Sequence, residues 1–259
     1  GELAVDLATT DESPWPEARA HTYTIEAEVT DESRRTITGL GEVRASKQQY
    51  FAFLDLKRGF YQVGDRIELE LATRDVMDRP VAARGEIRVE RVIRGVPGYV
   101  EALVHKEAIA TDKEGRAFFH WVPREAGQYR FTYEAVDDWK EKVTASSYTW
   151  VHGPDFDQAA FRLTGIQLIP EKQTYEEGET CRLLIVSSMP DVTLLLTQEA
   201  GSQVIGRSVL PLKGKSRVVE VPMRRGHIPN FLFRAAAVRE WQAYAAEVEV
   251  FVPPGKQFL

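Results

Sequence analysis

Cysteine is nearly absent from this sequence of 259 residues, in which Cys181 is the only one. No disulfide can form within the chain, which excludes a small extracellular scaffold held together by disulfides. Asparagine also occurs once, as Asn230 before Phe231 and Leu232, so the sequence has no N-glycosylation acceptor. The longest apolar runs are about six residues, whereas a membrane-spanning helix needs roughly 20. The sequence therefore predicts no such helix.

Basic segments are missing as well. The formal net charge is −6, so a nucleic-acid-binding protein with this composition would need a strong local basic patch. The densest basic positions, Arg34-Arg35 and Arg224-Arg225, are isolated pairs of the kind found in solvated turns. Glycine-rich phosphate loops are absent too. Nucleic acids and nucleotides are therefore not the expected partners.

The sequence contains little that points to catalysis. The five histidines are His21, His105, His120, His152 and His227, and none has metal-ligand spacing. No GxSxG-type turn is present. Ser202 is predicted in a hairpin loop, His120 in a strand beside an aromatic residue, and Cys181 as a small core residue. We therefore expect no catalytic, cofactor-binding or metal-binding residue, and no enzyme.

Two acidic pairs leave one alternative open. Asp137-Asp138 and Asp155 with Asp157 are clustered carboxylates, which hard cations such as Ca²⁺ prefer. A calcium site between domains is therefore the alternative to the simpler expectation, which is that these residues are solvated acids in loops.

Alternation of apolar and polar residues dominates the sequence. Residues 67–71, 86–90, 129–133 and 247–252 all follow the period of two that places one face of a strand on a core and the other in water. Turn signals such as Gly64-Asp65 and Ala126-Gly127 separate these runs. Residues 235–246 contain many alanines, which would suit a helix, but their surroundings favour two strands joined at Trp241. The prediction is an all-β chain of antiparallel sandwiches.

Two motifs recur at fixed distances. Tyr61, Gly64 and Asp65 precede one alternating strand, and Tyr175, Gly178 and Glu179 precede another 114 residues later. A pair of strands that ends each unit, here called the closing hairpin, recurs with a different offset. Tyr23 and Asp31 of the first copy precede Tyr129 and Asp137 of the second by 106 residues. Residues 230–252 form a third copy.

The opening motif therefore occurs twice and the closing hairpin three times. We interpret residues 1–46 as the closing strands of a preceding, incomplete unit, and residues 47–153 and 154–259 as two complete units. Each complete unit is long enough to bury its own core, so tandem domains are expected and not a solenoid.

The opening motif has a physical explanation of its own. Its glycine permits a backbone conformation that other residues disfavour, and its acid can accept hydrogen bonds from nearby backbone N–H groups. Its tyrosine can pack its ring on the edge of the core and satisfy its hydroxyl against the backbone. These residues are expected to build the entrance of a strand.

The order of the motifs resembles a known family. Tyr61-Gln-Val-Gly-Asp65, then Asp78-Arg-Pro-Val81, Thr111 to Ala117 and Pro123 to Tyr129 resemble one macroglobulin-like domain of the bacterial alpha-2-macroglobulin family. Residues 23–31 are similar to the end of the domain before it, and segments between Leu168 and Phe231 to the domain after it. The resemblance implies tandem seven-stranded, immunoglobulin-like or fibronectin-III-like β-sandwiches.

The same resemblance implies a function. Members of this family inhibit endopeptidases: a protease cuts an exposed bait segment, and the string of macroglobulin-like domains rearranges around it. The implied partners are target proteases, met by the full-length parent, and neighbouring domains of the same chain. The implied location is periplasmic or at the cell surface, and a lipoprotein parent is among the forms that the resemblance allows. No membrane contact by this segment is expected.

The sequence departs from that family at the covalent chemistry. Many members carry a thioester in the motif Cys-Gly-Glu-Gln, whereas Cys181 is followed by Arg182-Leu183-Leu184. A bait in residues 92–110 is an alternative, but residues 99–104 alternate as a strand does. The rival interpretation is a tandem immunoglobulin-like adhesin or a carbohydrate- or protein-binding stalk, for which Trp139, Trp150 and Trp241 are the candidate exposed aromatics.

Overall fold

The computed structural model describes residues 4, 20–96 and 98–255. Its regular structure is β-strand, apart from two short 3₁₀ helices. Most of residues 1–19 and Pro97 of the predicted Pro97-Gly98 turn lie outside the described residues. In chain order the strands are β1 (His21–Thr30), β2 (Thr36–Ala45), β3 (Phe51–Leu56), β4 (Phe60–Gln62), β5 (Ile67–Arg74), β6 (Arg84–Arg94), β7 (Tyr99–Ala110), β8 (Arg116–Trp121), β9 (Gly127–Val136), β10 (Lys142–His152), β11 (Ile166–Pro170), β12 (Thr180–Ser187), β13 (Thr193–Ala200), β14 (Gln203–Pro211), β15 (Ser216–Pro222), β16 (Asn230–Arg239) and β17 (Gln242–Phe251).

Strands β3 to β10 form the first sandwich. One sheet has the order β3-β5-β8 and the other β4-β10-β9-β6-β7. Strands β3 and β4 are two pieces of one edge strand that changes sheets at residues 57–59, and β4 pairs in parallel with β10. With that edge strand counted once, the sandwich has the predicted seven strands, and all other pairs are antiparallel.

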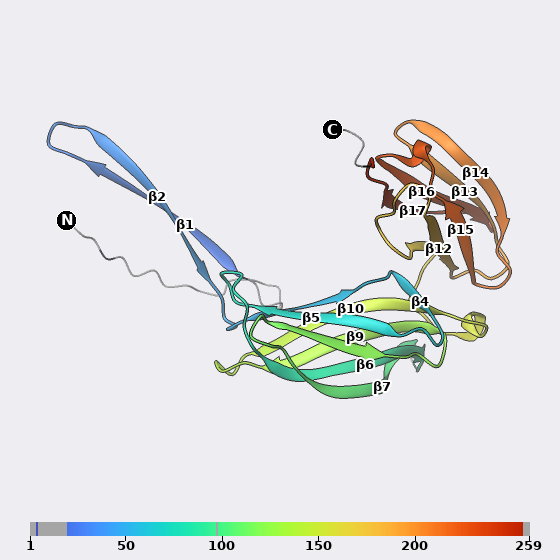
Figure 1. Cartoon of the computed structure of the whole chain (residues 1–259), viewed down its shortest axis with the longest axis horizontal. Helices are drawn as coiled ribbons and strands as arrows, with labels where there is room; N and C mark the ends of the chain where they lie inside the picture. Colours follow the sequence, from blue (N-terminus) through green and yellow to red (C-terminus); the bar gives the residue numbers. More distant parts are fainter. Residues whose placement is uncertain (1–3, 5–19, 97, 256–259) are drawn as a thin grey trace.

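Strands β11 to β17 form the second sandwich with the same strand order. Its sheets are β11-β12-β15 and β14-β13-β16-β17. The counterpart of β4 shrinks to a single parallel bridge between Thr174 and Phe251. The predicted hairpin at residues 235–246 is confirmed as the adjoining ends of β16 and β17, and Figure 1 shows the two sandwiches as separate bodies.

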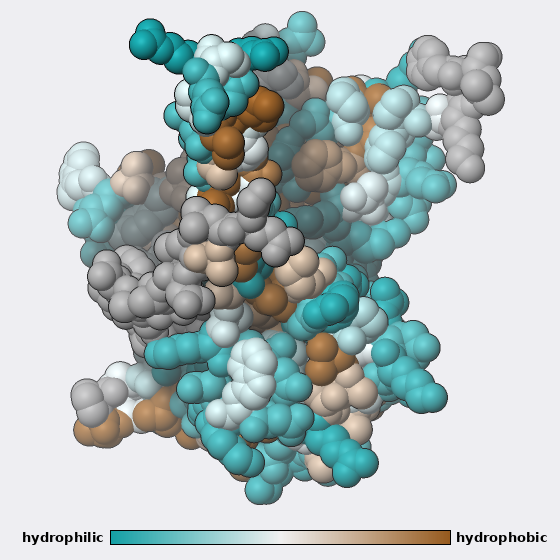
Figure 2. Space-filling model, turned by 90° about the vertical axis from the view of Figure 1, so that its left-hand side faces the viewer, coloured by the Kyte–Doolittle hydropathy of each residue, from teal (hydrophilic) through white to brown (hydrophobic). Residues whose placement is uncertain are grey.

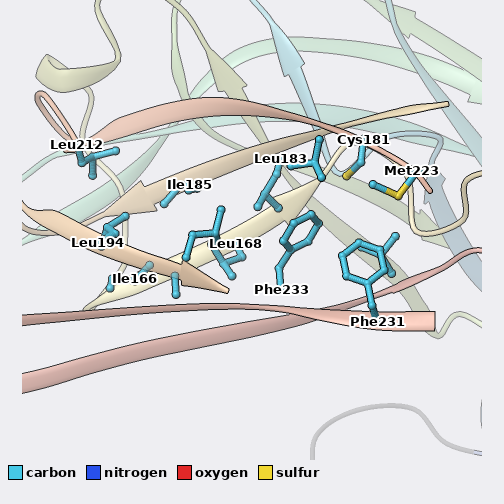
Figure 3. Close-up of a cluster of buried hydrophobic side chains, with 14 of the residues drawn as sticks. Ile166, Leu168, Cys181, Leu183, Ile185, Leu194, Leu212, Met223, Phe231 and Phe233 are labelled. Atoms are coloured by element: carbon cyan, nitrogen blue, oxygen red, sulfur yellow. The ribbon is translucent and has the colours of Figure 1, made fainter. Parts of the chain in front are cut away.

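Alternating side chains build the two cores. On β5, Ile67, Leu69 and Leu71 are fully buried while the residues between them are partly exposed. The equivalent residues on β12 are Cys181, Leu183 and Ile185, and Figure 3 shows Leu183 beside Phe233 of β16 and Cys181 beside Met223. Burial of such apolar area, worth about 25 cal/mol per Å², supplies the main driving force for each sandwich.

The predicted strand entrance is present in both sandwiches with matching contacts. Gly64 and Gly178 have φ angles of 91° and 93°. The carboxylate of Asp65 accepts the N–H of Gln62 at 3.0 Å, and that of Glu179 accepts the N–H of Glu176 at 2.8 Å.

The tyrosines of the entrance differ in one contact. Tyr61 and Tyr175 are both buried. The hydroxyl of Tyr175 accepts the N–H of Lys172 at 2.9 Å, as predicted. The hydroxyl of Tyr61 faces the backbone of Arg58, the counterpart of Lys172, but this contact lies outside ordinary hydrogen-bond geometry. Burial raises the pKa of both phenols.

Strands β1 and β2 form a hairpin, here called the N-terminal hairpin, that projects away from the first sandwich (Figure 1). Its register repeats that of β9 and β10 with an offset of 106: His21 pairs with Ala45, and Gly127 pairs with Val151. Its turn repeats as well. The carboxylate of Asp31 accepts the N–H of Arg35 at 2.9 Å, and that of Asp137 accepts the N–H of Glu141 at 2.9 Å.

The N-terminal hairpin lacks a covering sheet among the described residues. One of its faces carries Ile25, Val29, Ile37 and Val43, which are 42%, 68%, 75% and 53% exposed. Their counterparts 106 residues later include Phe131 and Val143, which are buried in a core. Apolar side chains are visible along the hairpin in Figure 2, behind its polar tip. The hairpin therefore has the residue pattern of core strands.

Candidate functional site: the junction between the sandwiches

The two sandwiches meet through a segment that the repeat itself reveals. The offset between closing hairpins is 106 residues and that between opening motifs is 114. The segment between a closing hairpin and the next opening motif is therefore eight residues longer after the first sandwich than after the N-terminal hairpin. Those residues lie in 153–165, and they include a 3₁₀ helix at Phe156–Gln158.

An apolar cluster at this place joins both sandwiches and the segment between them. It comprises Phe60, Ala126 and Trp150 of the first sandwich, Phe156 and Phe161 of the connection, and Ile169, Leu184 and Val186 of the second sandwich. We call these eight residues the junction cluster. All of them are at most 8% exposed. Burial of this kind makes the contact resemble part of a core more than two surfaces that touch.

Three aromatic rings form the centre of the junction cluster. The ring of Trp150 lies 5.2 Å from that of Phe161, edge to face at 71°, and 5.9 Å from that of Phe156. Phe156 and Phe161 are 5.6 Å apart. Such aromatic pairs contribute about 0.5–1.5 kcal/mol beyond the area that they bury.

The second sandwich presents an apolar outer face to these rings. On β12 every residue from Leu183 to Ser187 is buried, because one set of side chains faces the core and the other faces the junction. On β5 the positions equivalent to Leu184 and Val186 are Glu70 and Ala72, which are partly exposed. The apolar–polar alternation is lost at Leu183-Leu184-Ile185-Val186, and this loss is the sequence signal of the junction. The prediction of a strand with only one buried face overlooked it.

Polar contacts close the rim of the junction. The N–H of Gly59 donates to the carbonyl of Glu171 at 3.0 Å. The carboxylate of Glu171 lies 3.2 Å from Arg58 of the first sandwich and 3.4 Å from Arg182 of the second. The side chain of Glu171 is only 15% exposed, which reduces solvent screening of these pairs.

Two glycines allow the backbone to approach at the rim. A Cβ at Gly59 would lie 2.4 Å from the carbonyl oxygen of Pro170. A Cβ at Gly214 would overlap the carboxylate of Asp157, which accepts the N–H of Lys215 at 2.6 Å. A side chain at Gly59 would therefore push the second sandwich away from the first, and one at Gly214 would displace the side chain of Asp157 in the linking segment.

The acidic candidates have structural partners. Asp137 is buried and accepts the N–H groups of Gln49 and Glu141, so the expectation that it is solvated is wrong. Asp157 connects the linking segment to Lys215. In the described part of the chain, no three His, Cys, Asp or Glu side chains come together as a metal site would need. The carboxylates of Asp137 and Asp157 accept hydrogen bonds from the backbone, whereas Asp138 and Asp155 are exposed, as expected.

The other candidate residues are dispersed. Cys181 is buried in the second core, and burial raises the pKa of its thiol to about 11, which keeps it protonated and unreactive. His120 lies on β8 as predicted, with Nε2 3.2 Å from Glu68. Ser202 lies in the turn between β13 and β14. Within residues 92–110, the alternative bait, the strand predicted at 99–104 is confirmed as part of β7.

The tryptophans divide into two kinds. Trp150 is 4% exposed in the junction cluster, whereas Trp139 and Trp241 are 59% and 101% exposed at the turns of β9–β10 and β16–β17.

In the described ranges, no helix is long and apolar enough to cross a membrane.

Comparisons with known proteins give structural neighbours only. No family model matches the sequence. No curated protein matches it. Among solved structures, Salmonella alpha-2-macroglobulin reacted with methylamine aligns over 94% of this chain at 13% identity and a TM-score of 0.37. Escherichia coli alpha-2-macroglobulin activated by trypsin aligns over 92% at 13% identity and 0.34, and the elastase-activated form over 90% at 12% and 0.30.

This chain covers 18%, 19% and 26% of the lengths of those three structures. At these TM-scores and identities the likeness carries no argument about function. The sandwich fold rests on the strand order described above.

Proposed function

We propose that this chain is a non-catalytic scaffold segment of a bacterial alpha-2-macroglobulin-like protein, a broad-spectrum inhibitor that traps endopeptidases by conformational change. The observation that supports it most is the repeated strand entrance. Tyr61, Gly64 and Asp65, which carry the sequence resemblance, form the same turn as Tyr175, Gly178 and Glu179 in a sandwich of the same strand order.

The proposal includes the domain boundaries and the setting. Residues 1–46 are the closing strands of a preceding macroglobulin-like domain, and residues 47–153 and 154–259 are two complete ones. The exposed apolar face of the N-terminal hairpin supports the first assignment. The partners are target proteases of the full-length parent, and the location is periplasmic or at the cell surface.

We further propose a mechanical role for the junction cluster within such a trap. Eight buried residues, the carboxylate shared by Arg58 and Arg182, and the close backbone approach at Gly59 connect the first sandwich to the second. A rearrangement that encloses a protease would therefore move these two domains as one rigid wall element. The bending would occur at other joints, such as residue 46 between the N-terminal hairpin and the segment 48–50, which is hydrogen-bonded to the first sandwich.

The test uses the full-length parent mixed with unrelated proteases, among them trypsin and elastase. Cleavage, compaction by small-angle X-ray scattering, and residual activity toward large and small substrates are followed together. Cleavage at one segment, compaction, and loss of activity toward large substrates alone would support the trap. Scattered cleavage without compaction would rule it out.

A second function is favoured by one observation. Trp241 and Trp139 are exposed at equivalent turns, as aromatic residues of a carbohydrate- or protein-binding stalk would be. A glycan array probed with this chain, and with Trp139→Ala and Trp241→Ala variants, separates the two functions. Binding that both substitutions abolish would support the adhesin-like stalk, and an array without signal would count against it.

A further inference from the structure

The first sandwich has an open side between its two sheets. Strands β7 and β8 are the edge strands of the two sheets among the described residues, and a cleft of about 780 Å³ lies between them. Its lining includes His105 on β7, His120 and Trp121 on β8, and Arg66 and Arg124 at the rim. A volume of this size falls in the range of sites for small ligands and short peptides, about 300–1,000 Å³.

The floor of the cleft is aromatic. The ring of Trp121 lies 5.1 Å from that of Tyr129 and 6.1 Å from that of Phe131. The hydroxyl of Tyr129 donates to the carbonyl of Glu125 at 2.8 Å, and burial raises the pKa of this phenol to about 12. The floor is therefore rigid, neutral and able to pack an apolar side chain.

A bulge shapes one wall. The register between β6 and β7 shifts at Val89/Glu90, so that Val89 pairs with His105, Glu90 pairs with Leu103, and Val104 is the extra residue. Bulges at sheet edges redirect side chains. Here both Val104 and His105 line the cleft, and the ring of His105 lies 5.8 Å from that of Phe119 on β8.

The rim carries uncompensated positive charge. Three arginines and two glutamates line the cleft. Arg91 is paired with Glu125 and also donates to the carbonyl of Ala126 at 2.8 Å. Arg66 and Arg124 are exposed and form no ion pair with a described residue, while Glu107 lies 3.4 Å from Nε2 of His105. The lining therefore has a net formal charge of about +1 with neutral histidines, on a chain whose net charge is −6.

The matching end of the second sandwich is filled. Pro123 and Met223 are equivalent, because their carbonyls accept the N–H groups of Gly64 and Gly178 at 3.0 Å each. The loop after Met223 folds the buried His227 inward, where its ring lies 4.4 Å from that of Phe231 and Nε2 lies 2.8 Å from Gln198. The cleft is therefore a property of the first sandwich and not of the fold.

We propose that this cleft binds an extended acidic peptide segment of a partner protein. The free edges of β7 and β8 offer main-chain donors and acceptors to such a strand. Trp121 and Tyr129 pack one of its apolar side chains, and Arg66 and Arg124 pair with its carboxylates. This inference does not depend on the proposed trapping function.

The test measures peptide binding by nuclear magnetic resonance on the whole chain. The probes are acetyl-Glu-Phe-Glu-Val-Glu-amide, its lysine counterpart acetyl-Lys-Phe-Lys-Val-Lys-amide, and a sulfated heparin tetrasaccharide. Saturable shifts confined to the Trp121 indole and to residues 66, 104–107, 119–125 and 129 are expected with the acidic peptide alone. The shifts should weaken as the salt concentration increases from 50 to 300 mM, because salt shortens the Debye length to about 10 Å or less and screens the charges from each other.

The variant Arg66→Glu/Arg124→Glu should reduce affinity for the acidic peptide at least tenfold. Both side chains are exposed and lack ion-pair partners, so the fold should persist, and an unchanged amide spectrum verifies it. The matched control is Arg84→Glu at the opposite end of β6, which should bind as the wild type does. Absence of shifts at millimolar peptide, equal affinity of the double variant, or binding of the tetrasaccharide alone would each overturn the proposal.

Discussion

At the scale of single residues, the glycines of the two strand entrances explain why a short motif repeats. Gly64 and Gly178 have positive φ, and a Cβ at either would meet no atom within 4 Å. Space is therefore not the reason for glycine at these positions. The reason is the backbone conformation, because a positive φ costs a residue with a side chain about 1–2 kcal/mol.

The substitution Gly178→Ala should lower the free energy of unfolding of the second sandwich by about 1 kcal/mol. Gly226→Ala is the matched control, since it also has open space but no positive φ. Urea unfolding monitored by tryptophan fluorescence measures both. Equal destabilisation by the two substitutions would show that the φ angle is not what the motif preserves.

His152 makes the junction sensitive to acid. Burial lowers its pKa from 6.5, and the nearby Asp157 opposes this shift. The folded state therefore disfavours the charged ring, whose neighbour at 5.7 Å is Phe156. This group has no effect on stability well above pH 6.5, and it lowers the free energy of unfolding as pH falls from there toward the folded pKa.

Thermal unfolding should accordingly show a lower midpoint at pH 5.5 than at pH 7.5, and His152→Gln should reduce that difference. His227 shifts in the same direction, so part of the difference should persist in the variant. His21→Gln, on the N-terminal hairpin, serves as the control and should leave the pH dependence of the wild type intact. An unaltered pH dependence in His152→Gln would contradict the assignment.

At the scale of elements, β12 serves two partners. Leu183 and Leu184 are neighbours in sequence and both are 0% exposed, yet one belongs to the second core and the other to the junction cluster. Substitutions at these two residues therefore distinguish the stability of the second sandwich from the attachment of the two sandwiches to each other.

Leu183→Ala should lower the free energy of unfolding of the second sandwich by about 2–5 kcal/mol, as large-to-small core substitutions do. Leu184→Ala should instead loosen the junction, with faster proteolysis in residues 153–165 and a broader distance distribution in small-angle scattering. If Leu184→Ala unfolds the second sandwich and leaves the linking segment protected, the division of β12 is wrong.

Strands with a period of two, such as β5 and β9, could be predicted from the sequence because one face of each is buried and the other is wet. The closing hairpins could be predicted because Asp31 and Asp137 set the same turn. The three-residue β4 could not, since its parallel pairing with β10 depends on a distant strand. The junction could be predicted only in part: the apolar run from Leu183 to Val186 indicates a strand that is buried on both faces, but only the fold shows that the second face meets another domain.

At the scale of the whole molecule, the N-terminal hairpin tests the idea of a preceding domain. A two-stranded hairpin without a covering sheet is marginally stable in water. Its apolar face is exposed, whereas the hairpin β9–β10, 106 residues later, is packed in the first sandwich.

Amide hydrogen exchange should therefore be much faster in residues 21–45 than in residues 127–151 of this chain. In the longer parent that the proposed function implies, the first segment should become protected to a similar degree as the second. Mass spectrometry of both proteins resolves the two segments. Fast exchange of residues 21–45 in the parent would indicate that no sheet covers the hairpin there.

The parallel pairing of β4 with β10 has a consequence for tension. Force applied at the two ends of the first sandwich would pull these strands in opposite directions along their length. The residue pairs from Phe60–Trp150 to Gln62–His152 would then be loaded in shear and would have to break together. The second sandwich replaces this clamp with the single bridge Thr174–Phe251. A chain that is stretched from its ends should therefore open its second sandwich first and keep the first one as the stronger link.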